Sequence, residues 1–308
     1  MSDSSTNIRK PVLLIAAGLL VFGGAVFIWQ QQGKQEIPTA KVADSFSNLD
    51  LEELTASYQM LRYVVERGGD EHQRKFAIEW LDEQTRLKNP PKPDQETWLL
   101  SVIEKGGHPD WDIEAKLWIF NDAFAYLHLG NQHERLTAIL QNLALKHPHI
   151  TMRLYALQHI DIQRSVGNLT GPHADKTYEI LEQLAKESDG KVAGSALVAL
   201  TNWDGPKVPP SEKLVKLALQ LAADTNRTVD VRITAIHAVG NGALELARTL
   251  ATDLTQPVMI RKASIACIGK YGTETDTASL KQLAKENFRI AQAAEPALAA
   301  ITNRIANP

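Results

Sequence analysis

The sequence predicts an all-α protein: one N-terminal transmembrane helix, then an α-solenoid of about seven helix pairs. From residue 47 onward, apolar side chains recur every three or four positions, which is the spacing of one helix face. Glycine, proline and asparagine break this pattern about every 10 to 20 residues. No stretch alternates apolar and polar residues as a half-buried strand would.

Composition resembles that of ordinary globular proteins and removes several function classes. The chain has 308 residues, 33 Lys and Arg against 36 Asp and Glu, a formal charge of −3 and 44% apolar residues. A nucleic-acid-binding protein that works through net charge carries a basic excess, so we expect no nucleic-acid partner. Because Cys267 is the single cysteine, an intramolecular disulfide and a cysteine zinc site are excluded, and we expect no disulfide-linked oligomer.

Residues 12–29, VLLIAAGLLVFGGAVFIW, form an apolar run without a charge. As a helix this run spans roughly 27 Å, close to the thickness of a bilayer core. Arg9 and Lys10 precede it, so a cleaved secretory signal peptide is the alternative. We favour an uncleaved signal anchor, because the run is longer than a usual signal-peptide core of about 7 to 15 residues.

The charges beside the run predict its orientation. Arg9 and Lys10 lie directly before it, whereas the lysines after it are offset by acidic residues, which favours an N-terminus inside. We therefore expect a short cytoplasmic tail (1–11), a transmembrane helix (12–29), a polar stalk (30–46) and a helical-repeat domain (47–308). The repeat domain is expected outside the cytoplasm, in the periplasm if the membrane is a bacterial inner membrane.

A repeated motif marks the second helix of the predicted pairs. Val231-Arg232-x-x-Ala235-x-x-Ala238-Val239-Gly240 is matched by Ile260-Arg261-x-x-Ser264-x-x-Cys267-Ile268-Gly269. Further copies begin at Met152-Arg153 and Val192-Ala193, a weaker one at Ile113, and a degenerate one at Phe288-Arg289. Small residues on one helix face allow a neighbouring helix to approach closely.

This motif resembles the HEAT repeat of the armadillo-like α-solenoids, best over residues 190–270. Three departures stand out: His159 occupies a small-residue position, the first two pairs lack the arginine, and Pro296 is expected to interrupt the last helix. The N-terminal third is therefore open to tetratricopeptide-like or irregular packing. The resemblance implies a protein-interaction scaffold whose second helices line the concave side.

Residues with reactive side chains fit no catalytic pattern. The nine histidines form no His-Glu-x-x-His pair, and phosphate-binding and nucleophile-elbow motifs are absent. We interpret Cys267 as a small buried hydrophobe, and the acidic run Asp110–Glu114 as a helix cap rather than a carboxylate site. The arginines at 153, 232, 261 and 289 are expected to pair with acidic residues of adjacent repeats rather than to bind anions. No metal, no cofactor and no enzymatic activity are expected.

The motif also predicts an interaction surface. If Val231, Ala235 and Ala238 face the core, Thr234 and His237 point away from it. The corresponding positions on other second helices are Lys116, Ile119, Tyr155, Gln158, Ser195 and Val198. From these we define the candidate ridge as Lys116, Tyr155, Gln158, Ser195, Thr234 and His237. The alternative is that these side chains are merely solvated or covered by a neighbouring repeat.

The function predicted is that of a membrane-anchored scaffold that binds membrane or envelope proteins. Stacked repeats offer a long surface and no deep reaction cleft, which suits protein partners. Two alternatives stay open: an accessory subunit that positions a membrane enzyme or cofactor, and a cell-envelope hydrolase with an unrecognised site.

Overall fold

The computed structural model describes residues 51–187, 189–203 and 209–307. The chain divides into two units, Met1–Ala56 and Ser57–Pro308, and the fold described below is that of the second. The predicted tail, transmembrane helix and stalk lie outside the described residues. Within the described part, no helix is both long and apolar enough to cross a bilayer.

The described residues are mostly helical and contain no strand, which confirms the all-α prediction. In this part of the chain, fourteen α-helices follow one another and form seven consecutive pairs. The first helices of the pairs are α2 (Leu51–Arg67), α4 (Pro93–Glu104), α6 (His133–Lys146), α8 (Gly171–Ala185), α10 (Glu212–Ala223), α12 (Leu244–Thr252) and α14 (Thr277–Leu283). The second helices are α3 (Glu71–Leu87), α5 (Ile113–Leu127), α7 (Ile150–Ser165), α9 (Gly190–Thr201), α11 (Val229–Ala238), α13 (Val258–Tyr271) and α15 (Phe288–Ala306). Two short 3-10 helices, Gly240–Ala243 and Glu274–Asp276, precede α12 and α14.

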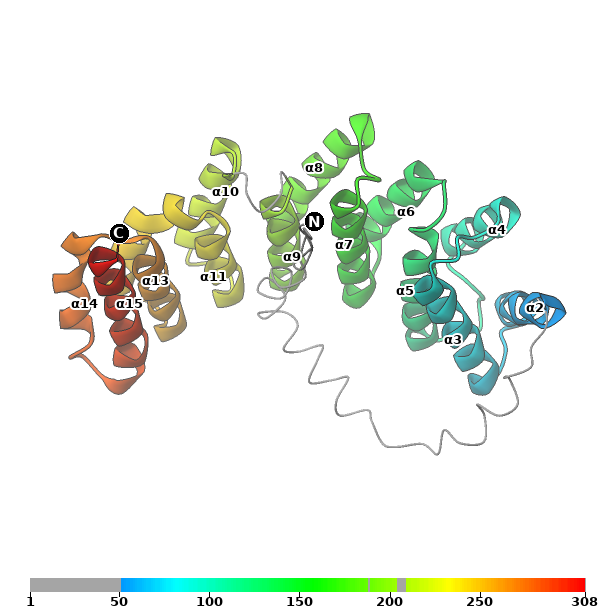
Figure 1. Cartoon of the computed structure of the whole chain (residues 1–308), viewed down its shortest axis with the longest axis horizontal. Helices are drawn as coiled ribbons and strands as arrows, with labels where there is room; N and C mark the ends of the chain where they lie inside the picture. Colours follow the sequence, from blue (N-terminus) through cyan, green and yellow to red (C-terminus); the bar gives the residue numbers. More distant parts are fainter. Residues whose placement is uncertain (1–50, 188, 204–208, 308) are drawn as a thin grey trace, which may run out of the picture. The chain divides into compact units, whose positions relative to one another are not determined.

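The pairs stack in chain order. From α6 onward, the first helix of each pair packs on the second helix of that pair, and each second helix also packs on the second helix of the next pair (Figure 1). The buried apolar side chains join into one core from Leu61 to Ile301. This is the arrangement of neighbour-coupled repeats, in which each pair buries its apolar stripes against the pairs beside it.

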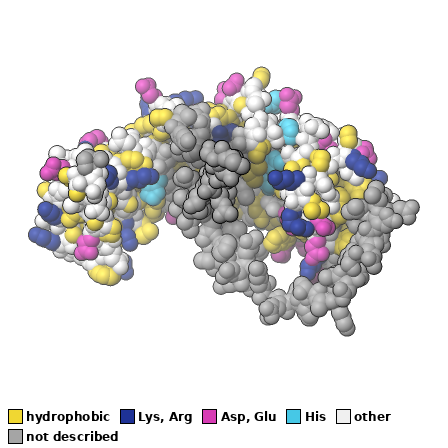
Figure 2. Space-filling view, viewed as in Figure 1, with side chains coloured by type: hydrophobic (Ala, Val, Ile, Leu, Met, Phe, Trp, Pro, Cys, Tyr) yellow, Lys and Arg dark blue, Asp and Glu magenta, His cyan; other side chains and the backbone are white. Residues whose placement is uncertain are grey.

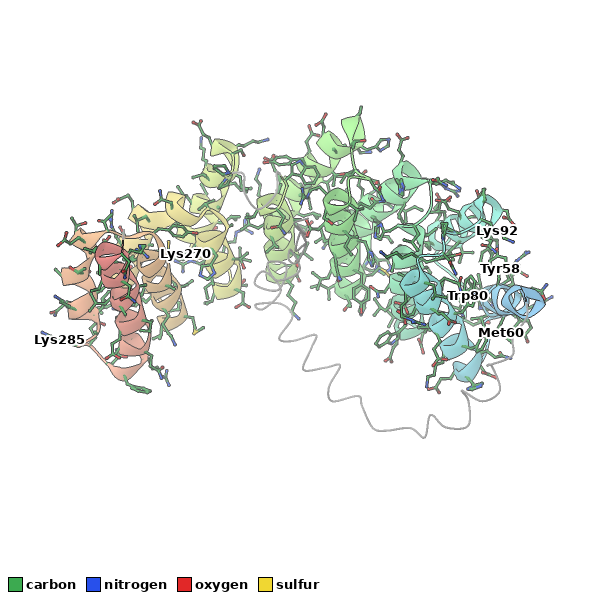
Figure 3. All side chains as sticks on the ribbon, in the orientation of Figure 1. Tyr58, Met60, Trp80, Lys92, Lys270 and Lys285 are labelled. Carbon is green, nitrogen blue, oxygen red and sulfur yellow. The ribbon has the colours of Figure 1, made fainter. Side chains whose placement is uncertain are left out.

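The N-terminal pairs are held together by large aromatic side chains instead of small ones. Tyr58 lies between Trp80 and Trp98, with ring centroids 5.9 and 5.7 Å away, and Trp80 also meets Tyr126 edge-on at 5.6 Å. Tyr58 and Trp80 lie close together in Figure 3. Rings of this size hold helices further apart than alanines do, so the packing of these pairs differs from that of the later ones.

Helix starts follow the cap residues that the sequence supplies. Asp112 accepts a hydrogen bond from the Ala115 amide at 2.7 Å and begins α5, which confirms the cap interpretation of the Asp110–Glu114 run. The prediction for Pro296 is wrong, because α15 continues through it. Pro296 lies on the exposed side of α15, where water can satisfy the carbonyl that loses its amide partner.

Arginines tie one pair to the next at the start of three second helices. Arg261 donates from Nε to the Ala251 carbonyl of its own pair (2.8 Å) and from Nη2 to both carboxylate oxygens of Glu286 in the next pair (2.7 and 2.9 Å). The arrangement recurs with Arg153 (Ala144 and Glu187) and with Arg232 (Ala222 and Gln256). The structural interpretation of these three arginines is therefore confirmed, although Arg232 meets an amide oxygen rather than an acid.

The other two copies differ. Arg289 is exposed and makes no such contact with the described residues, because the buried series of α15 begins at Ile290 rather than at Phe288. The predicted start of the last copy is thus wrong by two residues. In the copy that carries Ala193, a guanidinium comes from the opposite side of the junction: Arg227 donates to the Glu187 carbonyl.

Candidate functional site

The candidate site is the row formed by the second helices. From α3 to α15 each second helix contacts the next, so their outward-facing side chains lie along one continuous surface. On the face drawn in Figure 2, basic and acidic side chains of the described residues are interspersed with apolar ones. A mixed surface of this kind fits a protein partner better than a polyanion.

The predicted ridge residues are accessible to different degrees. Gln158 and His237 are exposed. The other four members are half-buried: Lys116, Tyr155, Ser195 and Thr234. Tyr155, Gln158, Ser195, Thr234 and His237 thus all retain accessible surface on three successive helices, α7, α9 and α11, as does Val198.

The register predicted for α5 is wrong. Ile119, expected to point away from the core, is 1% exposed, whereas Ile113 is 40% exposed. The buried series Ile119, Ala123 and Leu127 repeats that of Met152, Ala156 and Ile160 on α7. Asp122 therefore takes the place on α5 that Tyr155 holds on α7, and the two side chains interact electrostatically. Lys116 lies about 120° around the helix from Asp122 and so outside the row.

Asp122 is the electrostatically unusual member of the row. Burial raises the pKa of its carboxyl group to about 6, with a smaller contribution in the same direction from Asp82. The Asn121 amide opposes this shift by donating to Asp122 Oδ1 at 3.1 Å. Burial, and then Asp122, also raise the pKa of the Tyr155 phenol. A half-buried carboxylate without a cationic neighbour would be stabilised by a positive group from outside.

A hydrogen-bonded chain leads from the interior to Asp122. His128 Nε2 lies 2.8 Å from His159 Nδ1, and His159 Nε2 lies 3.3 Å from Asn121 Oδ1. Burial lowers the pKa of His128 to about 4 and that of His159 to about 3, so both rings are neutral at pH 7. The consistent assignment has His128 donating to His159, His159 donating to Asn121, and Asn121 donating to Asp122. This chain fixes the amide that holds Asp122.

The sequence contained one signal for this cluster, the histidine at position 159 where other copies carry a small residue. His159 is buried, stacks on His128 with ring centroids 5.1 Å apart, and also contacts Phe124. Asp122 and Asn121 carried no signal of their own, because the register on α5 was misplaced.

Other candidate residues fall into structural places. Cys267 is 4% exposed, and burial raises the pKa of its thiol to about 11, so the interpretation as a buried hydrophobe is confirmed. In the part of the chain that the structure describes, no group of three His, Cys, Asp or Glu side chains is placed to hold a metal ion. Its hollows include a shallow apolar groove of about 720 Å³ between α10 and α12, and a polar one of about 330 Å³ beside Gly68 and Trp111. Neither is lined by Asp122 or by His159.

No protein-family model matches the chain, and no curated protein matches its sequence.

Proposed function

We propose that this chain is a membrane-anchored scaffold of the HEAT-like α-solenoid type that binds a protein partner along its second helices. The observation that carries the proposal is the continuous row of contacting second helices. Its half-exposed aromatic and polar side chains match the composition of an interface centre. The arginine ties between pairs support the HEAT-like assignment, because they recur at corresponding positions in three repeats.

The chemistry of the row indicates which groups the partner brings. Tyr155 on α7 offers a large, half-buried ring, the type of side chain that dominates binding energy. Asp122 beside it has only an uncharged amide as a described hydrogen-bond donor. We therefore propose that the partner places an arginine or lysine against Asp122 and an apolar group against Tyr155.

Site-specific photo-crosslinking in native membranes tests this proposal. A benzophenone side chain at Gln158 or at His237, both exposed on second helices, should capture the same protein. The same group at Lys176, exposed on the first helix α8, should not capture it. In the protein that carries the benzophenone at Gln158, the double change Tyr155→Glu and His237→Glu should abolish the adduct and leave helicity and melting nearly unchanged. Lys176→Glu in the same protein should leave the adduct, the helicity and the melting unchanged. Equal capture from Lys176 would contradict the proposed surface.

The proposed topology has a separate test. Reporter fusions at residue 45 and at the C-terminus should both be active outside the cytoplasm, and the full chain should sediment with membranes. Activity only in the cytoplasm would invert the proposed orientation. A shortened, soluble product would show that residues 12–29 are a cleaved signal peptide.

A further inference from the structure

Exposed apolar side chains gather at two neighbouring turns near the C-terminus. We define the C-terminal apolar patch as Leu254 (75% exposed), Val258 (37%), Met259 (56%) and Phe288 (76%). Leu254, Val258 and Met259 lie in or just after the turn between α12 and α13, and Phe288 opens α15 after the next such turn. The ion pair between Arg261 on α13 and Glu286 before α15 holds these two turns against each other.

The earlier turns at the same edge of the array are polar. Between α10 and α11 the chain reads Asp-Thr-Asn-Arg-Thr (224–228), and between α8 and α9 it reads Lys-Glu-Ser-Asp (186–189). Leu254 and Met259 therefore belong to the α12–α13 turn alone, because the earlier turns carry polar residues at their positions. Val258 and Phe288 stand where the earlier second helices carry Val229 and Ile150, but those two are half-buried whereas Val258 and Phe288 are exposed. Phe288 in particular buries little of its surface in the fold. Its exposure to water costs free energy, and its ring contributes little to the packing of the fold.

The charges around the patch leave a positive excess. Glu286 is neutralised by Arg261, whereas Asp253 stays ionised, because hydrogen bonds from Gln256 and Thr255 lower the pKa of its carboxyl group. One negative charge therefore stands against the two positive charges of Lys285 and Arg289. Lys285 and Arg289 are exposed and form no ion pair with a described residue, and Lys285 projects outward in Figure 3. The N-terminal ends of α13 and α15 add partial positive charge at the same edge.

We propose that the C-terminal apolar patch binds the surface of a bilayer that contains anionic lipids. Exposed Leu, Met and Phe side chains flanked by Lys and Arg are the combination that partitions into the headgroup region of such a surface. An acidic protein would match the cations, but it would give no reason for four apolar side chains on turns. The inference rests on the proposed function only in that the anchor brings a membrane within reach of the patch.

A lipid-proximity measurement on the full chain tests the proposal. The native Cys267 is first replaced by Ala, the residue that other repeats carry at its position. Thr255, which is exposed beside Leu254, is then changed to Cys and labelled with an environment-sensitive fluorophore. The protein is placed in nanodiscs of phosphatidylcholine with phosphatidylglycerol and nitroxide-labelled lipid. We expect at least about a twofold loss of emission, reduced in phosphatidylcholine alone and at high salt. A label at Ser165, the exposed last residue of α7, should show no loss.

Variants separate the two parts of the surface. Leu254→Asp with Phe288→Asp should abolish the quenching, and Lys285→Glu with Arg289→Glu should abolish its dependence on anionic lipid. Val166→Asp, at an isolated apolar residue that is 58% exposed, is the matched control and should leave the quenching unchanged. Because all five side chains are exposed, helicity should be unaffected in each variant.

Three outcomes would overturn the inference. One is full emission at residue 255 in anionic discs that contain the protein. The second is an emission change at residue 255 only when two copies share a disc, which would assign the patch to a dimer. The third is an emission change at residue 255 only after an acidic protein is added, which would assign the patch to that protein. A protein that fails to enter discs contradicts the proposed anchor alone, because anionic vesicles added afterwards still report quenching at residue 255.

Discussion

Asp122 is held by an amide that is itself held by a buried histidine, so its carboxylate is positioned but not neutralised. The pKa of about 6 means that the fold disfavours the ionised form. Such a group lowers the stability of the folded protein at neutral pH, where it is ionised in both the folded and the unfolded state. The cost disappears as the pH falls from about 6 through the unfolded value near 3.8, because the carboxyl group then takes up its proton.

Replacing Asp122 by Asn should therefore stabilise the protein at pH 7.5 and not at pH 4. Asparagine keeps an oxygen that accepts from Asn121 and removes the charge. We expect a gain of about 1–2 kcal/mol in the free energy of unfolding at pH 7.5, after allowance for screening at a half-buried site. Urea denaturation at the two pH values measures the gain.

The comparison isolates Asp122 because the other titrating groups are the same in both proteins. His128 and His159 lower the stability of each as the pH falls from about 6.5 toward their pKa values of about 4 and 3, and this contribution cancels in the difference. Asp175→Asn, at an exposed position on α8, is the control and should show no pH-dependent gain. A gain for Asp122→Asn that is equal at both pH values would contradict the assigned pKa shift.

At the scale of the helix, the sequence predicted where α5 lies but not which face it buries. Its apolar stripe is wide, because α5 packs against both α3 and α7 and buries Phe120 and Phe124 as well as Ile119. A stripe of that width is compatible with two registers. The motif indicated the one that begins at Ile113, whereas the structure buries the series that begins at Ile119. On α7 and α11 the motif arginines Arg153 and Arg232 mark the register, which α5 lacks. Tyr155, Gln158, Thr234 and His237 accordingly lie on accessible surface as predicted.

The junction arginines were predictable because a long side chain recurs at a buried position, and a buried guanidinium requires acceptors. The acceptors themselves were not predictable. Glu187, Gln256 and Glu286 lie in the turns before α9, α13 and α15, and the sequence does not show which turn residue faces the neighbouring pair. The motif also placed the start of the last copy wrongly, at Phe288-Arg289 instead of Ile290. Asn287 caps α15 there, which puts both residues in the exposed first turn.

Removing a junction arginine should cost far more than removing the exposed one. Arg261→Ala leaves the Ala251 carbonyl and the Glu286 carboxylate without their donor, and we expect a loss of about 3 kcal/mol. Arg289→Ala should cost less than about 0.5 kcal/mol. Glu286→Gln reproduces the Gln256 acceptor of the α11 junction, so its loss should fall between the two. Urea midpoints rank the three variants, and a similar loss for Arg261→Ala and Arg289→Ala would contradict the role of the junction.

For the molecule as a whole, the array from Ser57 onward has its own continuous core and needs no membrane to bury it. A protein comprising residues 45–308 should therefore be soluble and strongly helical without detergent. Far-ultraviolet circular dichroism and size-exclusion chromatography measure this. A spectrum dominated by strand, or aggregation that detergent reverses, would show that the predicted anchor and stalk are part of the fold.

Stability should not be uniform along the array, because the row of first helices is discontinuous at α10. The helices α4, α6 and α8 contact one another in turn, whereas α10 packs on α11 and makes only sparse backbone contacts with α8 and α12, as α12 does with α14. One ion pair, Lys213 to Glu182 at 2.7 Å, joins α10 to α8. The apolar groove lined by Val215, Leu219 and Leu246 lies on its α12 side. Local opening follows low contact density, so α10 should exchange its amide hydrogens before α6 and α13 do. Hydrogen-exchange mass spectrometry on the full chain measures the order. Amide hydrogens of α10 that exchange as slowly as those of α13 would contradict this prediction. Contacts among the second helices α9, α11 and α13 would then be enough to stabilise the pairs around α10, and the groove would have no effect on stability.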